Sequence, residues 1–172
     1  MLAFFNFLKR KNGFTLVEVL TAIFVILVGV VGTMATIQQT LAYTSLSASR
    51  LVASYLAQEG IEIVRNFRDG NWLEQRSNPL LPWTDGLSPG DWEVDYNDSS
   101  LTSYIGLGRY LKIDGGFYNY ESGTNTKFRR KITIVQDSDG GNPRLKVSVL
   151  VEWQQVGKTH QVTAQEYLYN WR

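Results

Sequence analysis

A long run of apolar residues occupies the start of the chain, at residues 14–37. It consists mostly of Val, Ile, Leu, Phe and Ala, and Glu18 is the one charged residue within it. An α-helix of this length, rising about 1.5 Å per residue, would span roughly 36 Å. That length exceeds the ~30 Å hydrocarbon layer of a bilayer. The pattern therefore predicts a membrane-spanning helix.

The helix is expected to continue through residues 38–68 with only one face buried. No proline interrupts residues 36–67, and Asp69-Gly70 gives a common signal for a helix end. Apolar positions recur at steps of three and four, as on one face of a helix. They are Val52, Ala53, Leu56, Ala57, Gly60, Ile61, Val64 and Phe67. We expect this half to pack on the rest of its own chain.

The remainder of the chain, residues 69–172, is expected to form a globular head. Residues 69–108 are rich in turn formers and predict a long variable loop, with a short alternating strand near 91–96. Residues 109–172 alternate between apolar and polar positions and predict strands joined by tight turns. The candidate inward residues are Phe128, Ile132, Ile134, Leu145, Val147, Val149, Val151, Trp153, Val162, Ala164 and Leu168.

These elements together predict an α+β fold. Consecutive strands with short connections favour an antiparallel meander over residues 109–172. The expected architecture is one long N-terminal helix, apolar and then amphipathic, packed on a small antiparallel sheet.

Composition excludes several functional classes. The formal net charge is +1, so the chain has no basic footprint for nucleic acid. It contains no cysteine, so disulfides, thiol catalysis and cysteine-ligated metals are excluded. No phosphate loop, catalytic triad or paired-carboxylate site is evident, and we expect neither an enzyme nor a cofactor.

The charges around the apolar run carry the most information. Lys9, Arg10 and Lys11 precede it, which places the N-terminus in the cytoplasm by the positive-inside rule. A charge such as Glu18 within the hydrocarbon costs roughly 2.5–3.5 kcal/mol on insertion scales. Residues of this kind are functional candidates, so Glu18 needs an explanation.

Two ordinary interpretations leave this acid unexplained. A secretory signal peptide would have a basic start and a small-x-small cleavage site, for which Thr33-Met34-Ala35 qualifies. The apolar run is too long for such a peptide, and it holds an acid. A simple single-pass anchor accounts for the length of the run and gives no role to Glu18.

A third interpretation accounts for both features. The stretch KRKNGFTLVEVL, residues 9–20, resembles the class III signal of type IV pilins and type II secretion pseudopilins. The resemblance implies that residues 1–13 are a leader, which a prepilin peptidase cuts after Gly13. It further implies N-methylation of the new N-terminus, Phe14. Glu18 then becomes the fifth residue of the mature chain.

The resemblance also implies a role for the acid. In a growing fibre, the free amine of each incoming subunit meets the glutamate of the subunit before it. Because an unpaired charge is costly in a medium of low dielectric constant, such pairing sets the register between subunits. The implied partners are sister pilins, a prepilin peptidase, an inner-membrane platform and a cytoplasmic assembly ATPase. Membrane lipid surrounds residues 14–37 before assembly, and the pilus or pseudopilus is the final location, extracellular or periplasmic.

The subtype follows from one departure. Many major pilins have a helix-breaking proline at mature position 22, which is Ala35 in this chain. We therefore favour a minor pilin. The alternatives are a type II secretion pseudopilin and a membrane-anchored binding module, outside the cytoplasm, that does not polymerise.

Other candidate residues have simpler interpretations. Asp137, Asp139 and Asn142 share a short loop, but the twelfth position of a calcium loop counted from Asp137 falls on Ser148, so a hairpin turn is favoured over a metal site. His160 is expected at a strand surface. Core or interface anchoring is expected of the tryptophans, which are Trp72, Trp83, Trp92, Trp153 and Trp171.

Overall fold

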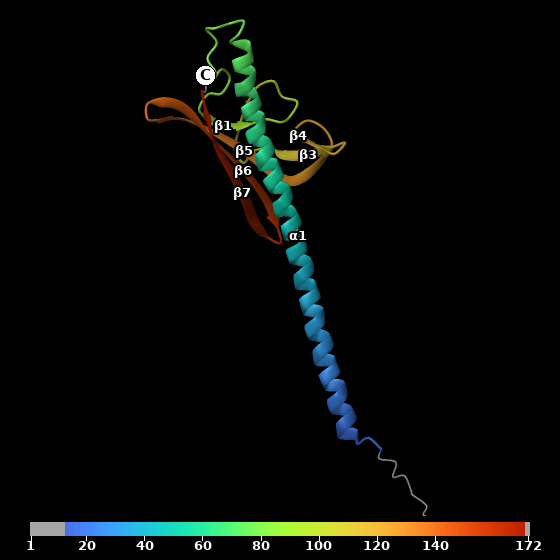
Figure 1. Cartoon of the computed structure of the whole chain (residues 1–172). Helices are drawn as coiled ribbons and strands as arrows, with labels where there is room; N and C mark the ends of the chain where they lie inside the picture. The colour runs from blue at the N-terminus through green and yellow to red at the C-terminus, as the bar shows by residue number, and fades with distance from the viewer. Residues whose placement is uncertain (1–12, 171–172) are drawn as a thin grey trace, which may run out of the picture. The chain divides into compact units, whose positions relative to one another are not determined.

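A computed structural model describes residues 13–170 of the chain (Figure 1). Most of the expected leader, including Lys9, Arg10 and Lys11, lies outside the described residues, as does Trp171. The structure contains one long helix, α1 (Leu16–Glu74), followed by seven strands in one antiparallel sheet. This arrangement confirms the α+β fold with a pilin-like order of elements. The described residues fall into two compact units, which divide between Ser45 and Leu46.

The described part of the N-terminal unit is residues 13–45, which form the first part of α1. This helix is long and apolar enough to cross a membrane, and none of its most apolar stretch is buried within the structure. The expected apolar half of the helix is therefore present as a helix whose side chains are free for other surroundings.

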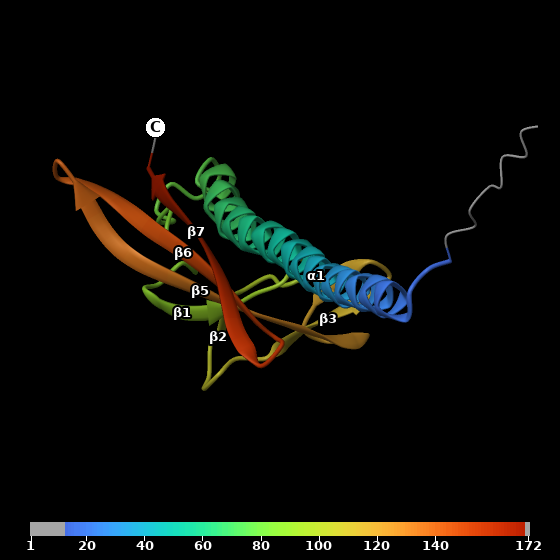
Figure 2. The same cartoon turned by 90° about the horizontal axis from the view of Figure 1, so that it is seen from below.

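In the C-terminal unit, residues 46–74 of α1 pack on one face of the sheet (Figure 2). The buried positions recur at steps of three and four, as predicted. They are Ser49, Ala53, Leu56, Ala57, Gly60, Ile61, Val64 and Arg68. Val52 and Phe67 are partly buried against the same core.

The predicted end of the helix at Asp69-Gly70 is wrong, because α1 continues to Glu74. Tertiary contacts hold the extra turn in place. The amide of Asn71 donates hydrogen bonds to the carbonyls of Trp83 and Asp85, at 3.1 and 2.8 Å. A glycine within a helix costs only about 1 kcal/mol, which such contacts offset.

The strands are β1 (Gly90–Glu93), β2 (Thr102–Ser103), β3 (Tyr110–Asp114), β4 (Phe117–Asn119), β5 (Thr124–Asp139), β6 (Asn142–Gln155) and β7 (Lys158–Tyr169). The first of them matches the short strand expected near residues 91–96. β5 and β6 extend into the loop expected between them, so that the turn of this hairpin is only Gly140-Gly141. These two glycines have φ angles of 56° and 88°, a backbone conformation that glycine adopts at no steric cost.

The prediction of one meander over residues 109–172 is only partly right. β5, β6 and β7 are consecutive antiparallel neighbours, as expected. β4, however, pairs with β3, and β3 rather than β4 lies against β5. β5 is long enough to pair with β1 through Ile132 and Ile134 and with β3 further towards its start. In a simple meander, β4 would lie beside β5, where the structure has β3.

Alternation along the long strands builds the core. The predicted inward residues Phe128, Ile132 and Ile134 of β5 are all buried, as are the five predicted on β6. Leu168 of β7 is buried, and Val162 and Ala164 pack at the edge of the core. The inner face of β5–β7 and the buried stripe of α1 therefore form one continuous, mostly apolar core.

Candidate functional site

The sequence features that indicate function meet at the start of α1. The side chain of Phe14 is 81% exposed, and the helix begins two residues later. The backbone N–H of Glu18 donates to Oγ1 of Thr15 at 3.2 Å, so Thr15 caps the helix. This is the first half of a capping box, in which Ser or Thr is followed three residues later by Glu. The motif T-L-V-E carried that signal, and the sequence reasoning missed it.

Glu18 lies in the first turn of α1, where a negative charge is favoured. The unpaired N–H groups at a helix N-terminus stabilise a nearby carboxylate by roughly 0.3–1 kcal/mol. Its side chain is exposed and has no hydrogen-bond or ion-pair partner among residues 13–170. The local backbone thus tolerates the acid and leaves its carboxylate available.

The helix surface around this acid is apolar on all sides. Large side chains between one-third and four-fifths exposed follow each other along the whole segment, with no polar stripe opposite them. They are Leu16, Val17, Val19, Leu20, Ile23, Phe24, Val25, Ile26, Leu27, Val28, Val30, Val31, Met34 and Ile37. A helix that is apolar all round is typically buried in lipid or among other helices.

The hydroxyl groups within this segment are satisfied internally. Thr21 donates to the carbonyl of Glu18 at 2.9 Å, and Thr33 donates to that of Val30 at 2.8 Å. The hydroxyl of Thr36 donates to the carbonyl of Gly32 at 3.0 Å. Since a bilayer offers no partners to polar groups, such internal bonds suit a helix surrounded by lipid.

The glycines of the segment add to its capacity for close contact. Apart from the adjoining backbone, no described atom lies within 4 Å of a Cβ built at Gly13, Gly29 or Gly32. Gly13, where cleavage is expected, is exposed and precedes the helix. Small residues on an apolar helix allow a second helix to approach closely.

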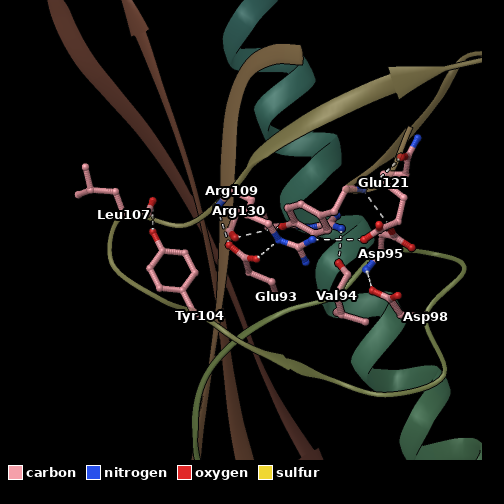
Figure 3. Close-up of polar contacts among 11 residues, drawn as sticks. Glu93, Val94, Asp95, Asp98, Tyr104, Leu107, Arg109, Glu121 and Arg130 are labelled. Atoms are coloured by element: carbon pink, nitrogen blue, oxygen red, sulfur yellow. Dashed lines mark hydrogen bonds and ion pairs between the residues drawn. The ribbon is translucent and has the colours of Figure 1, made fainter. Parts of the chain in front are cut away.

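In the C-terminal unit, the sequence reasoning missed a fully buried arginine, Arg130. It lies between two predicted core residues of β5, so the period of two placed it inward, but its charge concealed the assignment. Its guanidinium donates to the carbonyl of Leu56 at 3.1 Å. It also donates to the carbonyl of Val94 at 2.6 Å (Figure 3). It also forms an ion pair with Glu59 at 3.0 Å. Through these contacts, Arg130 of β5 connects α1 and the segment after β1 to the sheet.

A second polar network holds the segments between β1 and β4. Arg109 lies between Glu93, which is buried, and Glu121 (Figure 3). Its ion pairs with them measure 2.8 and 3.2 Å. The hydrogen bond that the Arg109 guanidinium donates to the Glu93 carboxylate raises the pKa of Arg109 above its ordinary value. These contacts order an otherwise irregular region.

The weak metal candidates Asp137, Asp139 and Asn142 lie at the β5–β6 hairpin. Arg144 binds both acids, at 2.8 Å from Asp137 and 3.0 Å from Asp139. A backbone hydrogen bond from Ser138 and the contact with Arg144 lower the pKa of Asp137. Within residues 13–170, no three His, Asp or Glu side chains are placed to hold a metal ion.

The aromatic candidates lie mainly in the core of the C-terminal unit. Trp83 and Trp153 are buried, and Trp72 and Trp92 pack against the core from its edge. His160 is half-buried on β7, where its ring stacks on that of Trp153 at 5.5 Å between centroids.

The comparison with protein families agrees with the features at the start of α1. The prokaryotic N-terminal methylation motif matches residues 8–34. A search of curated proteins and a search of solved structures each found no match. The matched segment includes Gly13, Phe14 and Glu18 and most of the apolar surface.

A long N-terminal helix with an apolar first part, an antiparallel sheet and a methylation motif together resemble a prepilin-like protein, and the motif supports that class. The motif is the class III prepilin signal that type IV pilins and pseudopilins share. It implies a structural subunit anchored in a membrane before assembly, with other pilin subunits and a prepilin peptidase as partners in general.

Proposed function

We propose that this chain is a fibre subunit, cleaved after Gly13, N-methylated at Phe14 and assembled through residues 14–37 into a type IV pilus-like fibre. The methylation motif at residues 8–34 carries this proposal. The cut leaves Phe14 as the new N-terminus, one residue before the Thr15 cap. The peptidase then acts on an exposed backbone outside the helix.

The exposed helix surface supports assembly. Fourteen large apolar side chains between Leu16 and Ile37 are open to their surroundings. Lipid covers them before assembly, and neighbouring subunit helices cover them afterwards. Because both surroundings are apolar, the transfer between them costs little hydrophobic free energy.

Glu18 gives the assembly its register. The described residues contain no partner for its carboxylate, and the free amine of Phe14 on an adjoining subunit has the opposite charge. An ion pair in a medium of low dielectric constant is favourable only in good geometry, while an isolated charge there is costly. Subunits therefore add at the axial position where amine and acid meet.

The role within the fibre follows from the same segment. No proline occurs in residues 14–37, and Ala35 continues α1 without a break. This supports a minor pilin, present in few copies, over a major one. Its further partners are an inner-membrane assembly platform and an assembly ATPase. Lys9, Arg10 and Lys11 hold the uncut N-terminus in the cytoplasm, so that the C-terminal unit lies outside.

Replacement of the acid tests this proposal. Glu18→Ala should be cleaved like the unaltered chain, because the leader and Gly13 are intact, and should be absent from sheared fibres. Immunoblots of the membrane and fibre fractions measure both steps. Thr21→Ala is the matched control, since it removes a polar side chain one turn further along and leaves the acid.

Normal incorporation of the Glu18→Ala subunit would show that register does not depend on this acid. If both Glu18→Ala and Thr21→Ala were absent from fibres, assembly would depend on any polar side chain near the start of the helix and not on the acid itself. Either result would contradict the role proposed for Glu18.

A further inference from the structure

One end of the C-terminal unit lies where α1 begins to pack on the sheet. The hydroxyl of Ser49 donates to Oε1 of Gln155, at the end of β6, at 2.8 Å. Nζ of Lys127, on β5, donates to the same two side chains, at 2.6 and 3.0 Å. The β6–β7 turn, Val156-Gly157, therefore lies beside this part of α1 (Figure 1). We call this end of the unit the basal end; the β5–β6 hairpin is at the opposite end of the same strands.

The basal end is basic. The segments that meet there are residues 46–58, 122–130 and 153–165, which hold five Lys or Arg residues and no Asp or Glu. Over the whole chain, acids and cations are almost equal in number, at 16 and 17. The cations are therefore concentrated at this end of the unit.

Three of these cations have no carboxylate partner. Arg50, Lys127 and Lys158 are all exposed. Within residues 13–170, none of them forms an ion pair, and the side-chain partners of Lys127 are neutral. Their charges are therefore not offset by the fold.

The other two cations add less, because an acid lies near each. Arg130 forms its ion pair with Glu59 at 3.0 Å. Glu152 lies directly opposite Arg129 in the β5–β6 register. The charge of the basal end depends mainly on the three exposed cations without a carboxylate partner.

Val156, at the tip of the β6–β7 turn, is strained and exposed. Its φ angle is 51°, and it is the one non-glycine residue with a positive φ between residues 13 and 170. Two-residue turns of this kind favour Asn, Asp or Gly, and a β-branched residue in this conformation is an outlier. The residue is 85% exposed, so its side chain adds little to the fold. Strain of this kind at the surface indicates a role outside the fold.

A second exposed apolar side chain lies near the same cations. Leu107 is 73% exposed. Together with Lys127, Gln154 and Thr159 it lines a hollow of about 250 Å³, in which Glu152 is the one acid. The basal end thus combines exposed apolar side chains with cations that have no partner.

This combination suits the surface of an anionic bilayer. Headgroup phosphates attract Lys and Arg side chains, and apolar side chains enter the boundary between headgroups and acyl chains. An aqueous surface would favour the charges but gives no reason for a strained valine at the tip of the turn. A lipid surface accounts for both features.

The chain itself keeps such a surface close. Twelve residues lead from Ile37, the end of the apolar segment, to Ser49, and a helix of that length spans about 18 Å. A tether this short gives the second contact a high effective concentration. We propose that the basal end docks on anionic phospholipid headgroups of the membrane that holds residues 14–37. This proposal depends on membrane anchoring and not on cleavage or on the fibre.

The full chain in lipid nanodiscs tests the proposal. Because the chain has no cysteine, Gln154→Cys provides a unique thiol for a fluorescent label at the basal end, and Ser138→Cys provides one near the β5–β6 hairpin. Both positions are exposed. A quencher attached to lipid headgroups reports how often each label lies at the membrane surface. Nanodiscs of phosphatidylcholine are compared with nanodiscs in which part of this lipid is replaced by anionic phosphatidylglycerol.

Quenching at position 154 should rise several-fold with phosphatidylglycerol, while quenching at position 138 should stay low. Lys158→Gln removes a cation that has no partner in the fold, and it should lower the ratio of docked to undocked chains by about fivefold. Arg76→Gln is the matched control, since it removes an exposed cation just beyond the far end of α1. It should leave the ratio unchanged.

Val156→Asn separates docking from folding. Asn adopts a positive φ more readily than a β-branched residue, so the urea midpoint of the C-terminal unit should be equal or higher. The apolar side chain is lost, so docking on phosphatidylglycerol nanodiscs should weaken by several-fold. A merely structural role of Val156 would not produce these opposite effects.

Equal quenching at positions 154 and 138 would overturn the proposal, as would quenching at position 154 that does not depend on phosphatidylglycerol. Equal effects of Lys158→Gln and Arg76→Gln would do the same. Unchanged docking of Val156→Asn would contradict the role of the apolar tip. If Lys158→Gln docked normally and was absent from fibres, the partner of the basal end would be another subunit. Fibre incorporation is a separate readout, so failure of docking leaves the fibre proposal unaffected.

Discussion

The two parts of α1 show how one continuous helix can present two different surfaces. Residues 16–37 carry large apolar side chains on all faces, and every residue from 16 to 45 is exposed. Residues 46–74 carry apolar side chains on one face only, and that face is buried against the sheet. The backbone is the same in both parts. The distribution of apolar residues around the helix therefore decides whether a part of it packs on its own chain or leaves its apolar side chains exposed.

Leucine substitutions should separate the two parts most clearly. Leu56 is 2% exposed in the core, and Leu27 is 57% exposed. Leu56→Ala should lower the free energy of unfolding of the C-terminal unit by about 2–5 kcal/mol, because it leaves a cavity. Leu27→Ala should change it by less than about 0.5 kcal/mol.

Urea unfolding in micelles, followed by tryptophan fluorescence, measures this difference, since all five tryptophans lie between residues 72 and 171. Equal effects of Leu56→Ala and Leu27→Ala would mean that both parts of the helix contribute alike to the stability of the fold.

Glycine substitutions give a second, smaller contrast. A Cβ at Gly60 would lie 2.9 Å from Cγ1 of Val149 and 3.2 Å from Cδ of Arg130. Gly60→Ala should therefore destabilise the C-terminal unit by about 1–3 kcal/mol through overpacking. The Cβ of Gly29→Ala meets no atom within 4 Å beyond the adjoining helix backbone, so this substitution should leave the stability of the C-terminal unit unchanged.

The same unfolding experiment applies to the glycine pair. A neutral or stabilising effect of Gly60→Ala would show that α1 does not approach the sheet as closely as described. Destabilisation by Gly29→Ala would show that the N-terminal part of α1 contacts the fold.

The buried phenol of Tyr120 gives the smallest expected effect on the free energy of unfolding, and this effect depends on pH. Burial raises the pKa of Tyr120 to about 12 from its ordinary value of 10.0. The neutral form is thus favoured in the folded state. The stability from this group is fully present below pH 10 and is lost as the pH rises from 10 towards 12, by at most about 1.4 kcal/mol per pH unit.

Tyr120→Phe should flatten this part of the stability profile, whereas Tyr96→Phe, at an exposed position, should retain it. Unfolding free energies measured between pH 9 and about pH 11 give the comparison. Parallel profiles for the unaltered chain and Tyr120→Phe would show that this phenol ionises as freely in the folded state as in the unfolded one.

Much of the fold was predictable because periodicity follows burial. Alternation along β6 correctly gave every inward residue from Leu145 to Trp153, and steps of three and four gave the buried face of α1. The helix end was not predictable, because it depends on hydrogen bonds from Asn71 to residues beyond it in the chain. The local sequence pattern does not predict hydrogen bonds to residues so far along the chain.

The functional candidates also differ in how far the sequence could predict them. Gly13, Phe14 and Glu18 were proposed from a contiguous motif, which the family comparison then matched. Arg130 was missed because its charge concealed its inward position on β5. Its partners Leu56, Glu59 and Val94 come from segments far apart in the chain, so no local pattern predicts these contacts.

The mass of the mature chain, purified from fibres of cells with an active prepilin peptidase, tests the central claim most directly. The account predicts a polypeptide that begins at N-methylated Phe14 and lacks residues 1–13. A chain that retains Met1, or one that begins at Thr36 after a signal-peptidase cut, would contradict it.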